Sequence, residues 1–85
     1  MYRIDLLRGS QKSLEKIQPQ ERTKIYTTIL QLENNPKPEG VNKLRDTNFW
    51  RVREGDYRII YSIDDKNKII TVTKIGHRRE IYRGF

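Results

Sequence analysis

The sequence predicts an α+β domain with the order β-α-α-β-β-β, in which two N-terminal helices pack on one face of a small, mostly antiparallel sheet. Three observations favour this fold class. Residues 2–6 alternate between apolar and charged side chains, as a half-buried strand does. Residues 14–32 carry apolar side chains at helical spacing. Residues 49–75 contain three runs rich in β-branched and aromatic residues, separated by two turn sequences.

Length and charge limit the classes of protein. A chain of 85 residues is expected to form one domain, residues 1–85, with one small core. The 18 lysines and arginines against 11 acidic residues give a net charge of +7, which favours a polyanionic partner such as nucleic acid. Cysteine is absent and histidine occurs once, so neither a disulfide, a metal site nor a cofactor is expected. With no apolar run long enough to span a bilayer, we expect a cytoplasmic protein without a membrane partner.

The first half of the chain predicts one strand and two helices. After the strand, Ser10 is expected to cap a short helix that buries Leu14 and Ile17 and ends before Pro19. Proline suits the first turn of a helix, so the second helix is expected to begin at Pro19. Its apolar stripe consists of Ile25, Ile29 and Leu32, and the sequence Asn34-Asn35-Pro36 ends it. Both stripes are expected to cover the apolar face of the sheet.

The stretch from Phe49 to Tyr61 predicts a hairpin around a type II′ turn at Gly55-Asp56. A two-residue loop pairs Arg53 with Arg58 and Trp50 with Tyr61. Because side chains alternate along a strand, one face of the hairpin then belongs to the core: Trp50, Val52, Tyr57, Ile59 and Tyr61. The other face carries Arg51, Arg53 and Arg58. Like charges opposite each other weaken a sheet, which indicates that this face serves an anion.

A second, looser turn at residues 64–68 leads to a fourth strand at residues 69–75. The register of this strand is ambiguous, because Ile69 and Ile75 favour one face while Ile70 and Val72 favour the other. A strand covered on both faces would have such a pattern. The sequence Gly76-His-Arg-Arg79 predicts a bend at the end of the strand.

The arginines of the hairpin, together with Arg78, Arg79 and Tyr82, form the candidate site. Guanidinium groups match phosphate oxygens, and a tyrosine beside them can stack on a base. His77 fits a polar turn residue as well as a proton donor or acceptor. We expect no carboxylate on this face, which disfavours a hydrolase with a protein nucleophile. RNA supplies its own nucleophile, the 2′-hydroxyl, and needs only alignment, proton transfer and charge stabilisation, without a metal.

Three stretches of the chain, taken together, point to a known family: Asn42-Lys-Leu-Arg45, Trp50-Arg-Val-Arg-Glu-Gly-Asp-Tyr-Arg-Ile-Ile-Tyr61 and Ile75-Gly-His-Arg-Arg-Glu-Ile-Tyr-Arg83. In this order they resemble the RelE branch of the RelE/ParE toxin superfamily, and the resemblance covers essentially the whole chain. It implies the toxin of a type II toxin-antitoxin system, a metal-independent endoribonuclease that cuts messenger RNA in the ribosomal A site. It also implies that the exposed concave face of the sheet is the active site.

The resemblance assigns roles by position. Arg51 and Arg53 match a basic pair, Arg58 a phosphate-stabilising arginine, Arg78 a candidate acid and Tyr82 a stacking tyrosine. We expect further contacts with RNA from Lys43, Arg45, Arg79 and Arg83. The basic pair is often lysine in relatives, and arginine is a poor general base. Arg51, His77 and a group of the ribosome are therefore alternatives for removing the 2′ proton.

The resemblance also implies partners. A RelB-like or other antitoxin is expected to bind the toxin in a hetero-oligomer, with an acidic or amphipathic segment over the basic face and the helices. The resemblance also implies that messenger RNA on the ribosome is the substrate and that the toxin contacts ribosomal RNA in the A site. Two alternatives are a ParE-like toxin that poisons DNA gyrase, and a catalytically weak module that binds RNA or the antitoxin. Relatives of the ParE type generally lack the full basic set and the final tyrosine, which favours the ribonuclease.

Overall fold

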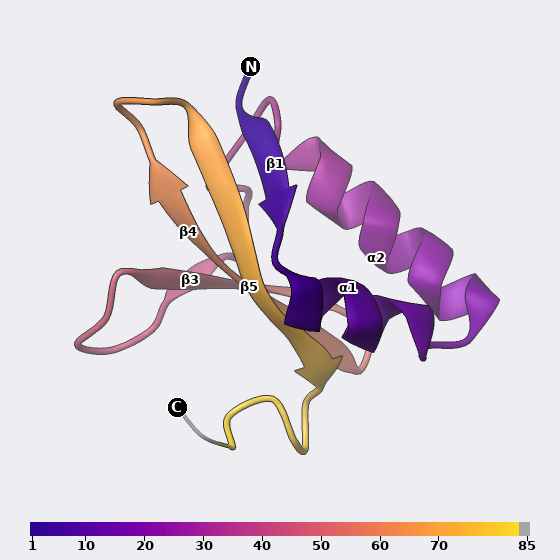
Figure 1. Cartoon of the computed structure of the whole chain (residues 1–85). Helices are drawn as coiled ribbons and strands as arrows, with labels where there is room; N and C mark the ends of the chain where they lie inside the picture. Colours follow the sequence, from indigo (N-terminus) through magenta and orange to yellow (C-terminus); the bar gives the residue numbers. More distant parts are fainter. Residues whose placement is uncertain (84–85) are drawn as a thin grey trace.

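The computed structural model describes residues 1–83 as one sheet with two helices against one of its faces (Figure 1). The elements follow in the order β1 (Arg3–Leu6), α1 (Arg8–Glu15), α2 (Pro19–Gln31), β2 (Asn42–Lys43), β3 (Phe49–Glu54), β4 (Tyr57–Asp64) and β5 (Ile69–His77). The predicted α+β class and the two N-terminal helices are confirmed. The two-residue strand β2 is an addition that the sequence did not predict.

The sheet has the strand order β1-β5-β4-β3-β2. Its first strand runs parallel to β5, and the other neighbours are antiparallel. Parallel neighbours need a long crossover, and the two helices lie in the chain between β1 and the rest of the sheet. No helix among residues 1–83 is both long and apolar enough to cross a membrane.

The sequence predicted the first residue of one helix correctly but not that of the other. Helix α2 begins at Pro19, as predicted. Helix α1 begins earlier than expected, at Arg8, so the prediction that Ser10 caps it is wrong. Ser10 is instead fully buried inside the helix, and its Oγ donates a hydrogen bond to the Val72 carbonyl at 3.0 Å. The hydroxyl therefore ties α1 to β5 rather than to its own N-terminus.

The core lies between the helices and one face of the sheet. The stripe of α2 supplies Ile25 and Ile29, which are buried as predicted, and Leu32 just beyond the helix is buried with them. The sheet supplies the rest of this layer: Val52, Ile59, Tyr61, Ile70, Val72 and Ile75. The predicted core face of the hairpin is confirmed, with Trp50 and Tyr57 packed at its margin.

The predicted register of the hairpin is confirmed pair by pair, including Arg53 opposite Arg58 and Trp50 opposite Tyr61. Gly55 has φ +58°, while Asp56 has no positive φ, which is the pattern of a type II′ turn. Glycine accepts this conformation without the steric cost that a Cβ atom brings.

The ambiguous register of the last strand is explained by a bulge. β5 pairs Lys74 with Ile60 but Val72 with Tyr61, so one residue of β5 has no partner in between. An extra residue shifts the alternation of the strand by one position. Ile75 therefore lies in the same core as Ile70, although the two positions have opposite parity.

Tyr61 provides a test of the core through its titration. It is fully buried, and its hydroxyl donates to the Pro36 carbonyl at 2.6 Å. Burial raises the pKa of Tyr61 from 10.0 to about 12. The contribution of the neutral Tyr61 side chain to the free energy of unfolding is therefore fully present below pH 10.0. It is lost as the pH rises towards about 12. We expect phenolate absorbance to show a step near pH 12 that Tyr61→Phe removes and that Tyr2→Phe, which removes the other tyrosine with a raised pKa, retains. A step near pH 12 that survives Tyr61→Phe would contradict this assignment.

Candidate active site

The site is built on the face of the hairpin that points away from the helices. Arg51 and Arg53 alternate with core residues along β3, and Arg58 lies opposite Arg53 on β4. Since the core residues point towards the helices, these three arginines share the open face of the sheet. Arg51 and Arg58 are half-buried, whereas Arg53 is exposed.

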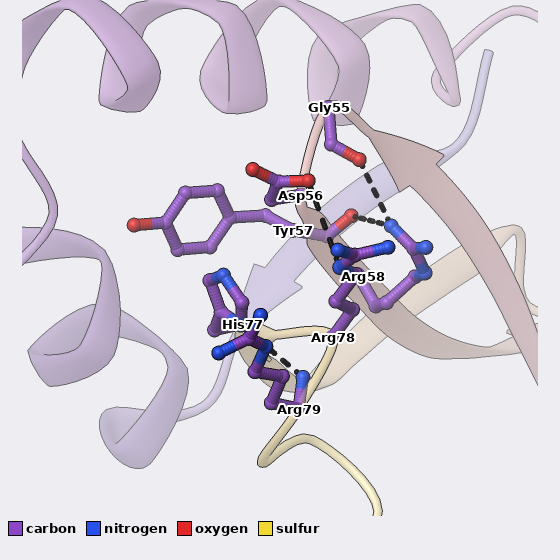
Figure 2. A network of polar contacts seen from close by, with 7 residues as sticks. All are labelled: Gly55, Asp56, Tyr57, Arg58, His77, Arg78 and Arg79. Atoms are coloured by element: carbon purple, nitrogen blue, oxygen red, sulfur yellow. Dashed lines mark hydrogen bonds and ion pairs between the residues drawn. The ribbon is translucent and has the colours of Figure 1, made fainter.

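Arg58 is held against the hairpin turn (Figure 2). Its Nη1 donates to the carbonyl of Gly55 at 3.0 Å and to that of Tyr57 at 2.9 Å. These two hydrogen bonds use one nitrogen of the guanidinium group. They fix the orientation of the group while the other N–H donors keep their capacity to bind an anion.

The electrostatics of the site centre on the same guanidinium. Partial burial lowers the pKa of Arg58, and the nearby charge of Arg53 lowers it further. Smaller effects come from Tyr82, which raises the pKa, and from Arg51 and Arg78, which lower it. Arginine stays protonated in proteins, so the lowered pKa indicates a charged group that is partly desolvated and, to a smaller extent, repelled by neighbouring positive charges. A bound phosphate would relieve that repulsion.

The C-terminal turn brings Tyr82 to β3. The Nη1 atom of Arg51 donates to the Tyr82 hydroxyl at 2.6 Å, and the side chain of Tyr82 remains 41% exposed. Ile81 anchors this turn, because it is buried and its Cδ1 lies 3.1 Å from the position that a Cβ atom on Gly76 would occupy. The missing side chain of Gly76 thus leaves room for the turn to pack on the sheet.

Arg78 is tied to the hairpin turn through Asp56. Its backbone N–H donates to the Asp56 carbonyl at 2.8 Å, and its Nε lies 3.7 Å from the Asp56 carboxylate. Both side chains are more than half exposed, so the ion pair itself adds little stability. We expected no carboxylate on the basic face, and the Asp56 carboxylate lies at its edge, on the hairpin turn. No residue pattern predicts this contact, because it depends on how the chain turns after β5.

His77 does not share a face with the hairpin arginines Arg51, Arg53 and Arg58. It pairs with Tyr57, a residue of the helix-facing side, and the two rings meet edge to face with centroids 5.7 Å apart. The backbone N–H of Arg79 donates to its Nδ1 at 3.2 Å. His77 lines a hollow of about 440 Å³ on that side, together with Gln18, Glu21, Gly55, Asp56 and Tyr57.

The four residues expected to contact RNA are spread over three places. Arg79 and Arg83 are exposed on the C-terminal turn, and Arg45 is exposed in the loop after β2. Lys43 pairs with Trp50, so its side chain lies on the opposite face from the arginines. The sequence interpretation missed Lys74, which pairs with Ile60 and shares the arginine face. Its position depends on the bulge, which no residue pattern revealed.

A metal centre was not expected. Among residues 1–83, no group of three or more His, Asp or Glu side chains lies close enough to hold a metal ion.

The fold is that of the RelE toxins. An archaeal RelE–RelB complex from Pyrococcus horikoshii contains a chain that superposes with a TM-score of 0.83 at 30% identity, over 93% of this chain and 97% of that one. A chain of the RelBE2 complex from Mycobacterium tuberculosis gives 0.81 at 22% identity, over 91% and 98%. The intact Escherichia coli RelBE complex gives 0.80 at 21% identity, over 91% and 96%.

Sequence comparison identifies the family. Residues 4–82 match the family described as the ParE toxin of the type II toxin-antitoxin system parDE. The chain belongs to this family, within the RelE/ParE superfamily, and is thus a toxin of the type II class. A shorter segment of 34 residues is 38% identical to Toxin RelG of M. tuberculosis, covering 40% of this chain and 39% of that protein.

Proposed function

We propose that this toxin is a ribosome-dependent endoribonuclease that cuts messenger RNA in the ribosomal A site and so inhibits translation. The observation that carries the proposal is the cluster of positive charge on the open face of the sheet. Arg51, Arg53 and Arg58 lie on the hairpin, and the C-terminal turn adds Arg78 and Tyr82. The core accounts for the other face of these strands but requires no arginine on this one.

The proposed reaction uses the RNA as its own nucleophile. The 2′-hydroxyl attacks the adjacent phosphorus, a bond from O2′ to phosphorus forms, and the bond from phosphorus to O5′ breaks. Negative charge accumulates on the phosphate oxygens during this step, and preorganised guanidinium groups stabilise such charge. The products are a 2′,3′-cyclic phosphate and a 5′-hydroxyl.

The contacts within the site support a division of roles. Arg58, whose orientation is fixed by two carbonyl groups, is the proposed clamp on the scissile phosphate. Arg51 and Arg53 add charge beside it, and Arg78, whose charge also acts on Arg58, is the proposed partner of the leaving O5′. The ring of Tyr82, anchored through its hydroxyl, offers a stacking surface for a base.

The base that removes the 2′ proton is proposed to come from the ribosome. Arginine is a poor base, and the ring of His77 lies against Tyr57 on the other side of the sheet. The Asp56 carboxylate is engaged by Arg78 at the edge of the site. An external base also gives a physical reason for dependence on the ribosome, since the isolated chain then lacks one catalytic group.

Arg58 provides the first test. Arg58→Ala should lower the cleavage rate by about a hundredfold to a thousandfold, because one preorganised group that stabilises transition-state charge is worth about 2.7 to 4 kcal/mol. Arg58 packs outside the main core, so the cooperative thermal unfolding should persist. His77→Gln serves as the comparison and should lower the rate less than about tenfold. Cleavage of a message by purified, programmed ribosomes measures both. Equal losses in the two variants would contradict the assignment of the site.

The chemical outcome provides the second test. Ends of the cut message should carry a cyclic phosphate upstream and a 5′-hydroxyl downstream, so that the downstream fragment accepts phosphate from a polynucleotide kinase without prior dephosphorylation. A 5′-phosphate on that fragment would exclude attack by the 2′-hydroxyl. A requirement for magnesium in the chemical step itself, as distinct from ribosome integrity, would contradict the metal-independent mechanism.

We also propose an antitoxin partner, as in the RelE–RelB complexes that share this fold. A hollow of about 330 Å³ between β1 and α2 is lined by Ile4, Leu6 and Ile29 and flanked by Tyr26 and Leu30. Tyr26 and Leu30 are 48% and 45% exposed and lie one turn apart on α2, so they form one exposed apolar surface beside the hollow. An amphipathic antitoxin segment would bury them, while its acidic residues would complement the charge of +7.

The antitoxin surface provides the third test. Tyr26→Ser with Leu30→Ser should weaken binding of the antitoxin encoded beside the toxin by about tenfold or more, because each buried large apolar side chain is worth about 1.5 to 3 kcal/mol. Lys24→Ser on the same helix is the matched control and should bind normally. Calorimetric titration of the purified toxin measures both affinities. An unchanged affinity in the double variant would show that the antitoxin binds elsewhere.

A second candidate function follows from the family match, whose description names the ParE toxin. A ParE-like toxin would act on DNA gyrase instead of RNA. Following translation and plasmid supercoiling separately after expression of the toxin distinguishes the two functions. Early loss of supercoiling with intact messages would favour the gyrase alternative.

A further inference from the structure

A second basic surface lies at the β2 edge of the sheet, on the side opposite the arginines. β2 pairs with β3 so that Lys43 lies opposite Trp50 and Asn42 lies opposite Arg51. Side chains alternate along both strands, so the first pair faces the helix side and the second pair faces the arginine side. The two basic surfaces therefore meet at one edge of the sheet.

Two ammonium groups converge on the ring of Trp50. The Nζ of Lys37, in the loop after α2, lies 4.8 Å from the ring centroid, and the Nζ of Lys43 lies 6.0 Å from it. Both distances are within the range of cation-π interactions. Trp50 is half-buried and packs against the core, which holds the ring in place. We call Lys37, Lys43 and Trp50 the tryptophan patch.

The tryptophan patch has no internal neutralising charge. Within the part of the chain that the structure describes, the ion pairs join Arg3 to Asp5, Arg45 to Asp46 and Arg78 to Asp56, and none includes a lysine of the patch. Beside the patch, residues 43–48 line an open hollow of about 440 Å³, and the Arg45 side chain on its rim is 96% exposed. Two cationic residues and one carboxylate line this hollow, Lys43, Arg45 and Asp46, so its net charge is positive even though Arg45 is paired with Asp46.

We propose that the tryptophan patch is a second RNA-binding surface, with Lys37 and Lys43 on phosphates and the half-buried Trp50 side chain against a base or ribose. Positive charge interleaved with an aromatic ring is the arrangement by which proteins hold nucleic acid strands without reading sequence. An acidic peptide fits less well, because the large exposed apolar side chains among residues 1–83 lie elsewhere: Met1, Leu7, Tyr26, Leu30 and Tyr82. The patch offers such a peptide little to bury.

The identity of the bound RNA depends on the proposed function. If the toxin acts on the ribosome, the strand at the patch would be ribosomal RNA, while the arginine face holds the message. Contacts on both sides of one sheet edge would fix the orientation of the toxin in the A site. Removing the two positive charges of the patch should therefore weaken binding of the toxin to RNA. It should also make that binding less dependent on salt concentration.

The experiment uses Trp50 as a local probe, since it is the only tryptophan in the chain. A short synthetic RNA hairpin, and separately purified ribosomes, are titrated into the full-length Arg58→Ala protein, which should leave RNA uncut. We expect the hairpin to change Trp50 emission. In the same background, Lys37→Gln with Lys43→Gln should weaken binding of both probes by about tenfold and reduce the slope of log K against log salt by about two. The control, Lys12→Gln on α1 with Lys16→Gln at the residue just after it, removes the same charge and should have less than half of either effect.

Three results would overturn the proposal: no binding of either RNA probe, equal effects of the two double variants, or hairpin binding without a change in Trp50 emission. Weakened binding of the antitoxin with unchanged RNA binding would instead identify the patch as a protein-docking surface and would overturn it as well. If RNA binding depends on the patch but the unmutated toxin cuts no message, this inference is supported and the proposed ribonuclease function is refuted.

Discussion

The pairing of Arg53 with Arg58 across the hairpin is the constraint on which the site depends. Two like charges at opposed positions cost stability, and the core enforces the arrangement. Val52 and Ile59, the neighbouring pair, are buried against the helices, so a slip of one residue would exchange core and arginine faces. Hydrophobic burial therefore places the arginines, and the repulsion that remains prepares the site for an anion.

The second requirement is the C-terminal turn, which completes the site from a distant part of the chain. Ile81 packs over Gly76 and is buried apart from the main core. This contact holds the turn against the strand ends, where the Arg78 amide reaches the Asp56 carbonyl and the Tyr82 hydroxyl reaches Arg51. The apolar contact between Ile81 and Gly76 thus positions the side chains of Arg78 and Tyr82, which are too exposed to be held by their own packing.

The two faces of the sheet divide stability from binding. The helix-facing side contains nearly all buried apolar residues, while the other side concentrates charge that the fold does not need. A domain of 85 residues has a small core, and repulsion among the arginines acts against its stability. Binding of an anionic partner would relieve that repulsion, whether the partner is the proposed RNA or an acidic antitoxin segment. In the proposed function, the same electrostatic property therefore serves both activity and its inhibition.

The sequence by itself determined the elements whose signals are local. Alternation along the hairpin and the glycine of its turn predicted the register that places Arg51, Arg53 and Arg58, and helical spacing predicted the buried stripe of α2. Tertiary structure decided what depends on residues far apart in the chain. The bulge in β5 placed Lys74 on the arginine face, pairing with Tyr57 turned His77 away from it, and the path of the chain after β5 brought Arg78 to Asp56. Periodicity records which residues share a face within one strand, whereas these contacts arise only when strands, bulge and turn pack together.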